Sequence, residues 1–178
     1  MTRAELEHLI RAAADIADDE AIIVVGSQAI LGQFPDAPAE LRVSVEADVY
    51  PRHRPERADL IDGSIGEGSP FHATYGYYAQ GVDASTSVLP TGWEERLVPI
   101  RNANTRGATG WCLDVHDLLI AKAVAGREKY RAFIQDAARY GLVDEGAARA
   151  RLAITPLDPS VRQRVEQTLT AGFSAARR

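Results

Sequence analysis

The sequence has one cysteine, Cys112, and no apolar run near the length of a membrane span. A single cysteine excludes an internal disulfide and a zinc site built from several cysteines. The four histidines are scattered along the chain, without the spacing typical of metal ligands. Because a spanning helix needs about 18 or more apolar residues and the first residues form no apolar signal region, we expect a cytoplasmic protein that does not contact a membrane.

Lysine is also scarce, since Lys122 and Lys129 are the only lysines among 20 basic residues. The formal net charge is −5, which argues against an indiscriminate nucleic-acid binder, so we expect no stable binding to DNA. Residues 1–50 hold ten acidic and three basic residues, whereas residues 144–178 hold four acidic and six basic ones. The chain therefore has an acidic beginning and a mildly basic end.

The hydrophobic pattern predicts an α/β (α+β) protein with a small mixed sheet flanked by helices and a C-terminal helical bundle. The length of 178 residues fits a single compact unit, which we divide into a core over 1–113 and a helical region over 114–178 that packs on the core. The predicted helices of the core cover 3–18, 28–32 and 55–65. Its predicted strands cover 21–25, 42–50, 75–82, 96–101 and 108–113, and the last two form a hairpin. The predicted helices of the C-terminal region cover 114–141, 144–152 and 158–176.

A Gly-Ser pair, Gly26 and Ser27, follows the predicted buried strand over 21–25 and precedes a short helix. Such a turn exposes backbone N–H groups and a hydroxyl at a helix N-terminus, which is a place for phosphate oxygens. The structural alternative is a glycine needed for a tight turn and a serine that caps the helix.

The next predicted strand alternates regularly, with Arg42, Ser44, Glu46 and Asp48 on one face and apolar residues on the other. Two carboxylates at positions i and i+2 of a strand point the same way. Paired in this manner, they can hold Mg²⁺ and leave its other coordination positions to water and substrate phosphates. The alternative is the solvated outer face of an edge strand.

Lys122 lies among apolar residues of a predicted helix, so its amine must either extend to water or meet an anion. In a continuous helix Lys129 lies two turns further on nearly the same face. The two lysines could therefore approach one phosphate-bearing ligand together. Two lysines that reach solvent at the edge of the helix explain the same pattern.

Together these motifs resemble the minimal nucleotidyltransferases of the DNA polymerase beta-like superfamily. That pattern is an apolar strand, Gly-Gly or Gly-Ser, a short helix and then acid-x-acid on the next strand, and here it reads Val-Val-Gly-Ser at 24–27 and Val-Glu-Ala-Asp-Val at 45–49. The segment Arg-Val-Ser-Val-Glu-Ala-Asp at 42–48 is closer still to the abortive-infection AbiEii-like branch. Residues 117–122 and 126–129 resemble that branch's downstream helix, whose lysine approaches the nucleotide phosphates.

The resemblance implies an enzyme that uses Mg²⁺ to move a nucleoside monophosphate from an NTP to a hydroxyl of tRNA, another RNA or a protein. It also implies a role in a toxin–antitoxin pair or in phage defence, with a cognate antitoxin or toxin as partner. The implied metal ligands are Glu46, Asp48 and, from a later strand, Asp83, with Lys122 as a further catalytic residue. The implied nucleotide-binding residues are Gly26, Ser27, Arg42, Ser44, Arg127 and Lys129.

The sequence departs from the family pattern in three ways that favour a second hypothesis. Glu46 stands where aspartate is usual, eighteen residues separate Ser27 from Glu46, and Asp83 is equally placed to be the first turn residue after its strand. The alternative function is a catalytically inactive module that keeps the fold and binds a nucleotide or a partner protein, as an antitoxin or regulatory subunit.

Overall fold

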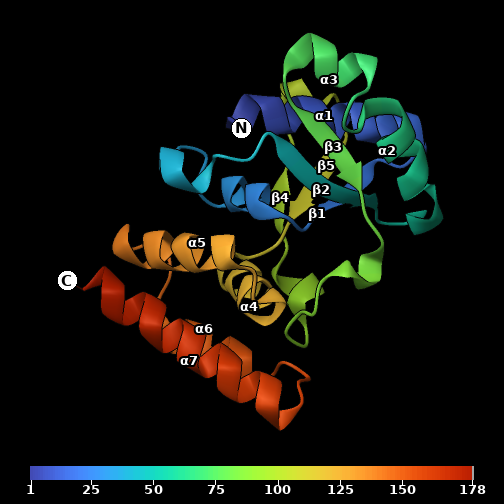
Figure 1. Ribbon diagram of the computed structural model, residues 1–178. Coiled ribbons are helices and arrows are strands. Elements are labelled where there is room, and N and C mark those ends of the chain that lie inside the picture. The colour runs from blue at the N-terminus through green and yellow to red at the C-terminus, as the bar shows by residue number, and fades with distance from the viewer. Residues whose placement is uncertain (178) are drawn as a thin grey trace. The chain divides into compact units, whose positions relative to one another are not determined.

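Five strands form one mixed sheet in the order β3-β2-β1-β5-β4. The computed structural model describes residues 1–177, and Figure 1 shows the strands β1 and β2 side by side near the middle of this sheet. The strands are β1 (Ala21–Val24), β2 (Glu46–Pro51), β3 (Tyr78–Gly81), β4 (Val98–Ile100) and β5 (Thr109–Cys112).

The central strand β1 is buried along its whole length. It runs antiparallel to β2 and parallel to β5, so strands cover both of its edges and its β-branched residues pack inside the sheet. Val24 pairs with Val49, and the N–H of Val25 donates to the carbonyl of Asp48 at 3.0 Å. The end of β1 therefore lies beside the acidic half of β2.

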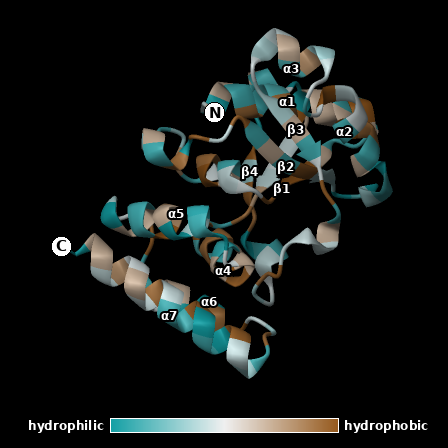
Figure 2. Cartoon of the chain, viewed as in Figure 1, coloured by the Kyte–Doolittle hydropathy of each residue, from teal (hydrophilic) through white to brown (hydrophobic). Residues whose placement is uncertain are grey.

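Helix α1 (Arg3–Ala17) packs on the sheet together with α2 (Ala58–Ile65). Leu6, Leu9 and Ile10 of α1 are fully buried, as their helical spacing predicts. A side chain at Gly110 of β5 would come within 2.3 Å of Ile10 Cδ1, so this glycine permits α1 to approach the sheet closely. Figure 2 shows the hydrophobic colour gathered on the central strands that these helices cover.

The chain divides into two compact units, one of residues 1–86 and 97–113, and one of residues 87–96 with the chain from residue 114 onward. The second unit contains α4 (Val115–Ala125), α5 (Glu128–Arg139), α6 (Glu145–Ala153) and α7 (Pro159–Ala176). That this helical region packs on the core stays a prediction.

A buried carboxylate joins the segment 87–96 to the helical unit. Asp117 of α4 is fully buried and accepts hydrogen bonds from Arg96 Nε at 2.9 Å and Arg96 Nη2 at 3.1 Å. Arg151 of α6 forms a second ion pair with it at 3.1 Å. Burial raises the pKa of Asp117 and the two arginines oppose that rise. The charged form of Asp117 therefore depends on both arginines.

The expected α/β class and the C-terminal helices are confirmed, and so is the hairpin of β4 and β5. Two predicted strands are shorter than expected. The strand predicted over 42–50 begins only at Glu46, and the region predicted as strand over 75–82 begins with the end of helix α3 (Pro70–Tyr75). The helix predicted over 114–141 is interrupted at Gly126, whose φ of +65° ends α4. None of the helices within residues 1–177 has the length and apolar character of a membrane span.

Asp19 ties the start of β1 to the chain beyond β2. Its carboxylate accepts hydrogen bonds from the N–H groups of Ala21 at 3.0 Å, His53 at 2.7 Å and Arg54 at 3.2 Å, and the His53 ring nitrogen lies 3.0 Å away. Burial works to raise the pKa of Asp19, but the hydrogen bonds from Ala21 and His53 outweigh it and lower the pKa. The charged form of Asp19 is thus the form that stabilises the fold.

We expect Asp19→Ala to lower the free energy of unfolding by about 2 kcal/mol at pH 7, because hydrogen bonds to a charged group are lost. A lowered folded-state pKa gives stability that is present above the unfolded value of about 3.9 and is lost as the pH falls through the folded value. Urea unfolding at pH 7 and near pH 3 measures this, with Asp36→Ala at an exposed position as the control. A deficit of equal size at both pH values would contradict the prediction.

Candidate functional site

The Gly-Ser turn and the acidic strand meet at Gly26 and Asp48. Gly26 has an ordinary extended backbone, with φ −80° and ψ −168°, so its conformation does not require glycine. Its surroundings do, because a Cβ at this position would lie 1.9 Å from Asp48 Oδ2 and 2.7 Å from Asp48 Cγ. The carboxylate of Asp48 therefore lies directly against the backbone of the turn, where no side chain fits.

Glu46 and Asp48 share one face of β2. Both are half-buried, and the intervening Ala47 and the following Val49 are fully buried, as expected from the alternation of side chains along a strand. In the parallel pairing of β2 with β3, Glu46 stands opposite Tyr78 and Asp48 opposite Gln80. The two carboxylates thus project from the same side of the sheet at the end of β1.

Tyr78 is the partner of Glu46 that the sequence analysis missed. Its hydroxyl donates a hydrogen bond to Glu46 Oε2 at 3.2 Å. Burial, together with the negative charges of Glu46, Glu67 and Asp48, raises the pKa of Tyr78 to about 12. Tyr78 consequently stays a neutral hydrogen-bond donor at physiological pH. The alternation within β3 was the only sequence signal for this pairing.

Asp83 does not join the two acids in a three-carboxylate group. Its Oδ1 accepts hydrogen bonds from the N–H of Ser85 at 2.8 Å and from the Ser85 hydroxyl at 2.5 Å, and these bonds lower the pKa of Asp83. Within residues 1–177 no three His, Cys, Asp or Glu side chains gather as a group that could hold a metal ion. The expectation of Asp83 as a third ligand is therefore corrected, because this residue begins the turn after β3.

Arg42 and Ser44 are also not placed on the strand face with the acids. Both precede β2, and the Ser44 hydroxyl accepts a hydrogen bond from the Glu46 N–H at 3.1 Å. The carbonyl of Ser44 accepts one from Gln28 Nε2 at 3.0 Å. The structure thus uses Ser44 to hold the entry to β2 beside the helical turn η1 (Ser27–Gly32), and the predicted shared face is limited to Glu46 and Asp48.

Gln28 is a second residue that sequence reasoning missed. It is fully buried directly after Ser27, and no residue between 1 and 177 forms a hydrogen bond with its Oε1 atom. A buried amide oxygen without a protein partner usually meets an ordered water or a ligand atom. The sequence signal was a polar residue within an otherwise apolar short helix.

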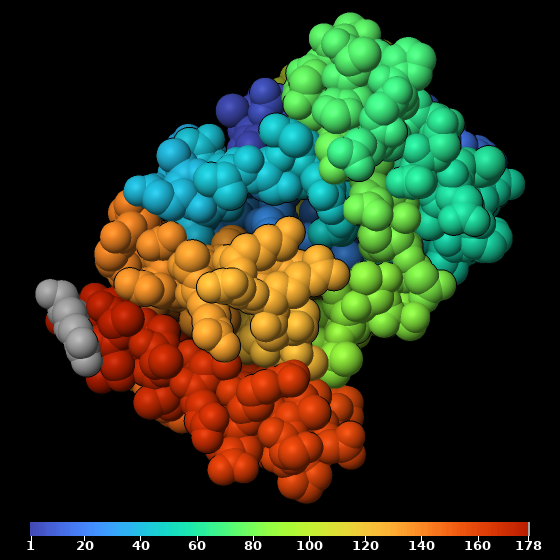
Figure 3. All heavy atoms as spheres, in the orientation of Figure 1, coloured from blue at the N-terminus to red at the C-terminus, as the bar shows by residue number. Residues whose placement is uncertain are grey.

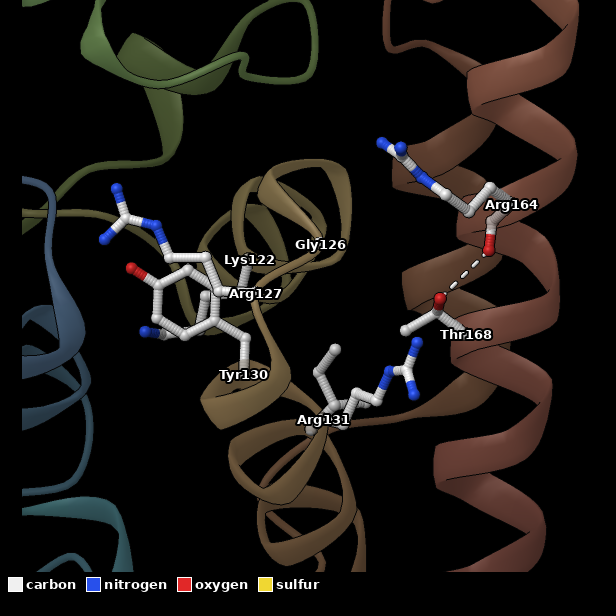
Figure 4. A pocket seen from close by; sticks show the side chains of 8 residues that line it. Lys122, Gly126, Arg127, Tyr130, Arg131, Arg164 and Thr168 are labelled. Atoms are coloured by element: carbon white, nitrogen blue, oxygen red, sulfur yellow. Dashed lines mark hydrogen bonds between the residues drawn. The ribbon is translucent and has the colours of Figure 1, made fainter.

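In the helical unit, the predicted lysines gather around one aromatic ring. Lys122 Nζ lies 4.1 Å from the ring centre of Tyr130 and 4.4 Å from that of Phe133. Arg127 and Lys129 approach the Tyr130 ring at 5.7 and 5.5 Å, and Figure 4 shows Arg127 beside Tyr130. Lys122 is 4% exposed, so its charged group is shielded from solvent and makes cation–π contacts with both rings.

Comparison with models of protein families gives a match. The model of a family described as nucleotidyltransferase of unknown function (DUF6036) matches residues 4–170. The chain belongs to this family. The match supports the broad nucleotidyltransferase superfamily and does not extend to the AbiEii-like branch. No curated protein and no solved structure matches.

Membership in this family agrees with the geometry of the turn and the acidic strand. A glycine whose Cβ position is filled by an aspartate carboxylate, next to a second acid on the same strand face, is an arrangement in which phosphates and a divalent cation can meet.

We expect Gly26→Ala to lower the free energy of unfolding by about 1 to 3 kcal/mol, because the added methyl group displaces Asp48 from a filled site. The control is Gly63→Ala in α2, where a Cβ would meet nothing within 4 Å. We expect this variant to raise the free energy of unfolding by up to about 1 kcal/mol. Urea unfolding of both variants measures the difference. Equal midpoints for Gly26→Ala and the unmodified chain would show that Asp48 does not pack against the turn.

Proposed function

We propose that this protein is a Mg²⁺-dependent nucleotidyltransferase that moves a nucleoside monophosphate from an NTP to a hydroxyl of an acceptor. The observation that carries the proposal is the contact between the Asp48 carboxylate and Gly26, with Glu46 on the same strand face. RNA or protein as the acceptor, and a role in a toxin–antitoxin pair or phage defence, rest on the resemblance of the sequence motifs.

The two acids fit a magnesium ion. Mg²⁺ is bound in many proteins by one or two carboxylates together with substrate phosphates and water, and Glu46 and Asp48 supply such a pair. When bound, the ion would neutralise phosphate charge and act as a Lewis acid. The hydrogen bond from Tyr78 orients Glu46, so the longer glutamate side chain has a defined position.

The turn residues would hold the phosphates of the NTP. The backbone N–H groups of the turn would bind phosphate oxygens beside Asp48, and Ser27 would add a hydroxyl. In the reaction the acceptor oxygen bonds to the α-phosphorus, the bond to the β-phosphate breaks, and the acceptor gives up its proton as pyrophosphate leaves. The resemblance of the sequence motifs implies that Lys122, Arg127 and Lys129 stabilise the charge on the leaving phosphates.

A second candidate function is a nucleotide-binding module without catalysis. It is favoured by the lack of a third acid beside Glu46 and Asp48 within residues 1–177. Such a module would bind an NTP with Mg²⁺ and transfer nothing. Labelled NTP incubated with total RNA and total protein distinguishes the two functions, because only the enzyme transfers label to an acceptor.

We expect each of Glu46→Gln and Asp48→Asn to weaken Mg²⁺-dependent NTP binding by about tenfold or more, because a charged metal ligand becomes neutral. Calorimetry with ATP, GTP, CTP and UTP, each with and without Mg²⁺, measures this. Asp83→Asn is the matched control and should bind as the unmodified chain does. Unchanged binding in both acid variants, or no binding of any NTP by the folded unmodified protein, would overturn the proposal.

A further inference from the structure

The helical unit contains a pocket with a basic lining between α5 and α7. Four of its lining residues are basic and none is acidic, and they include Arg127, Arg131 and Arg164. Figure 4 shows Arg131 on the side of α5 that faces α7, and Arg164 on α7. In Figure 3 the segment that forms α5 is exposed on the visible face of the molecule.

Helices α5 and α7 approach closely at one glycine next to the pocket. A Cβ at Gly172 of α7 would come within 2.7 Å of Ile134 Cγ2 on α5. One helical turn before this contact lie Arg131 on α5 and Thr168 on α7, and both line the pocket together with Ile134. The close approach at Gly172 therefore places this turn of α5 beside α7.

Arg164 and Arg131 lack acidic partners. Arg164 Nη2 donates to the carbonyl of Val124 at 2.9 Å, which orients its guanidinium group without neutralising it. No hydrogen bond or ion pair joins Arg131 to any residue between 1 and 177. Other arginines of the unit are neutralised, for example Arg149 by Glu145 and Arg139 by Asp136.

The two units also differ in overall charge. The helical unit holds 12 basic and ten acidic residues, and the sheet unit holds eight basic and 15 acidic residues. A basic pocket in the less acidic unit concentrates positive potential where anions meet little repulsion.

We propose that the pocket between α5 and α7 binds a phosphate group through the guanidinium groups of Arg131 and Arg164. Planar guanidinium groups match phosphate oxygens with two parallel hydrogen bonds. The phosphate belongs either to a free nucleotide or to the backbone of an RNA chain, which present the same chemistry. This site uses no carboxylate, so it binds its ligand without a metal ion. Lys122 and Arg127 also line the pocket, but Arg131 and Arg164 have no role in the proposed NTP site.

The test measures binding in EDTA at about 50 mM salt, where phosphate contacts are weakly screened. The probe is a fluorescein-labelled single-stranded RNA of 12 nucleotides, followed by anisotropy, and ATP and inorganic phosphate compete with it and are also titrated alone by calorimetry. The variants are Arg131→Gln and Arg131→Gln/Arg164→Gln. Arg149→Gln removes the same charge from an ion-paired site of the same unit and is the control. Thermal melting checks that each variant is folded.

We expect the double variant to weaken binding of at least one probe by about tenfold or more, and Arg131→Gln alone to have part of this effect. Arg149→Gln should change binding by less than about threefold. If the double variant loses binding of RNA alone, the ligand is a nucleic-acid backbone. If it loses binding of ATP and phosphate, the ligand is a free nucleotide. The proposal would be overturned if the double variant bound every probe as tightly as the unmodified chain, or if the unmodified chain bound none of them. It would also be overturned if Arg149→Gln weakened binding as much as the double variant does. Because EDTA removes magnesium, these outcomes are separate from those of the metal-dependent NTP experiment.

Discussion

The contact between the Asp48 carboxylate and the backbone at Gly26 is the constraint on which the site depends. The antiparallel pairing of β1 and β2 brings the two residues together, and the bond from the Val25 N–H to the Asp48 carbonyl holds the strands there. A residue with a Cβ does not fit at Gly26. The Gly-Ser turn and the acid that we propose as a metal ligand thereby become neighbours through sheet register, although twenty-one residues separate Gly26 from Asp48 in the chain.

The half-buried and buried acids of the protein have different partners. Glu46 accepts a hydrogen bond from the hydroxyl of Tyr78, whose pKa is raised by burial and by the neighbouring acids. Asp19, by contrast, is satisfied by backbone N–H groups and serves the fold. Asp117 is buried between two arginines and serves the helical unit. Of these acids, Glu46 and Asp48 are the two that share a strand face beside the turn, which is why we assign the chemistry to them.

Sequence reasoning found the turn, the acid pair and the basic helix, because each has a local pattern. It was wrong about Arg42 and Ser44, since alternation continues in the sequence beyond the point where β2 begins. It was wrong about Asp83 because a residue that ends a strand and one that begins a turn look alike. Tyr78 and Gln28 were missed because their partners, Glu46 and Ser44, come from other segments of the chain.

The sequence by itself determined the class of the fold, most of its elements and the pair Glu46 and Asp48, because helical spacing, strand alternation and turn residues are properties of neighbouring positions. Tertiary structure alone decided that Gly26 lies under Asp48, that Tyr78 holds Glu46, and that Gly172 brings α5 against α7. These are contacts between distant segments, and they follow from strand register and helix packing, which a local pattern of residues does not specify.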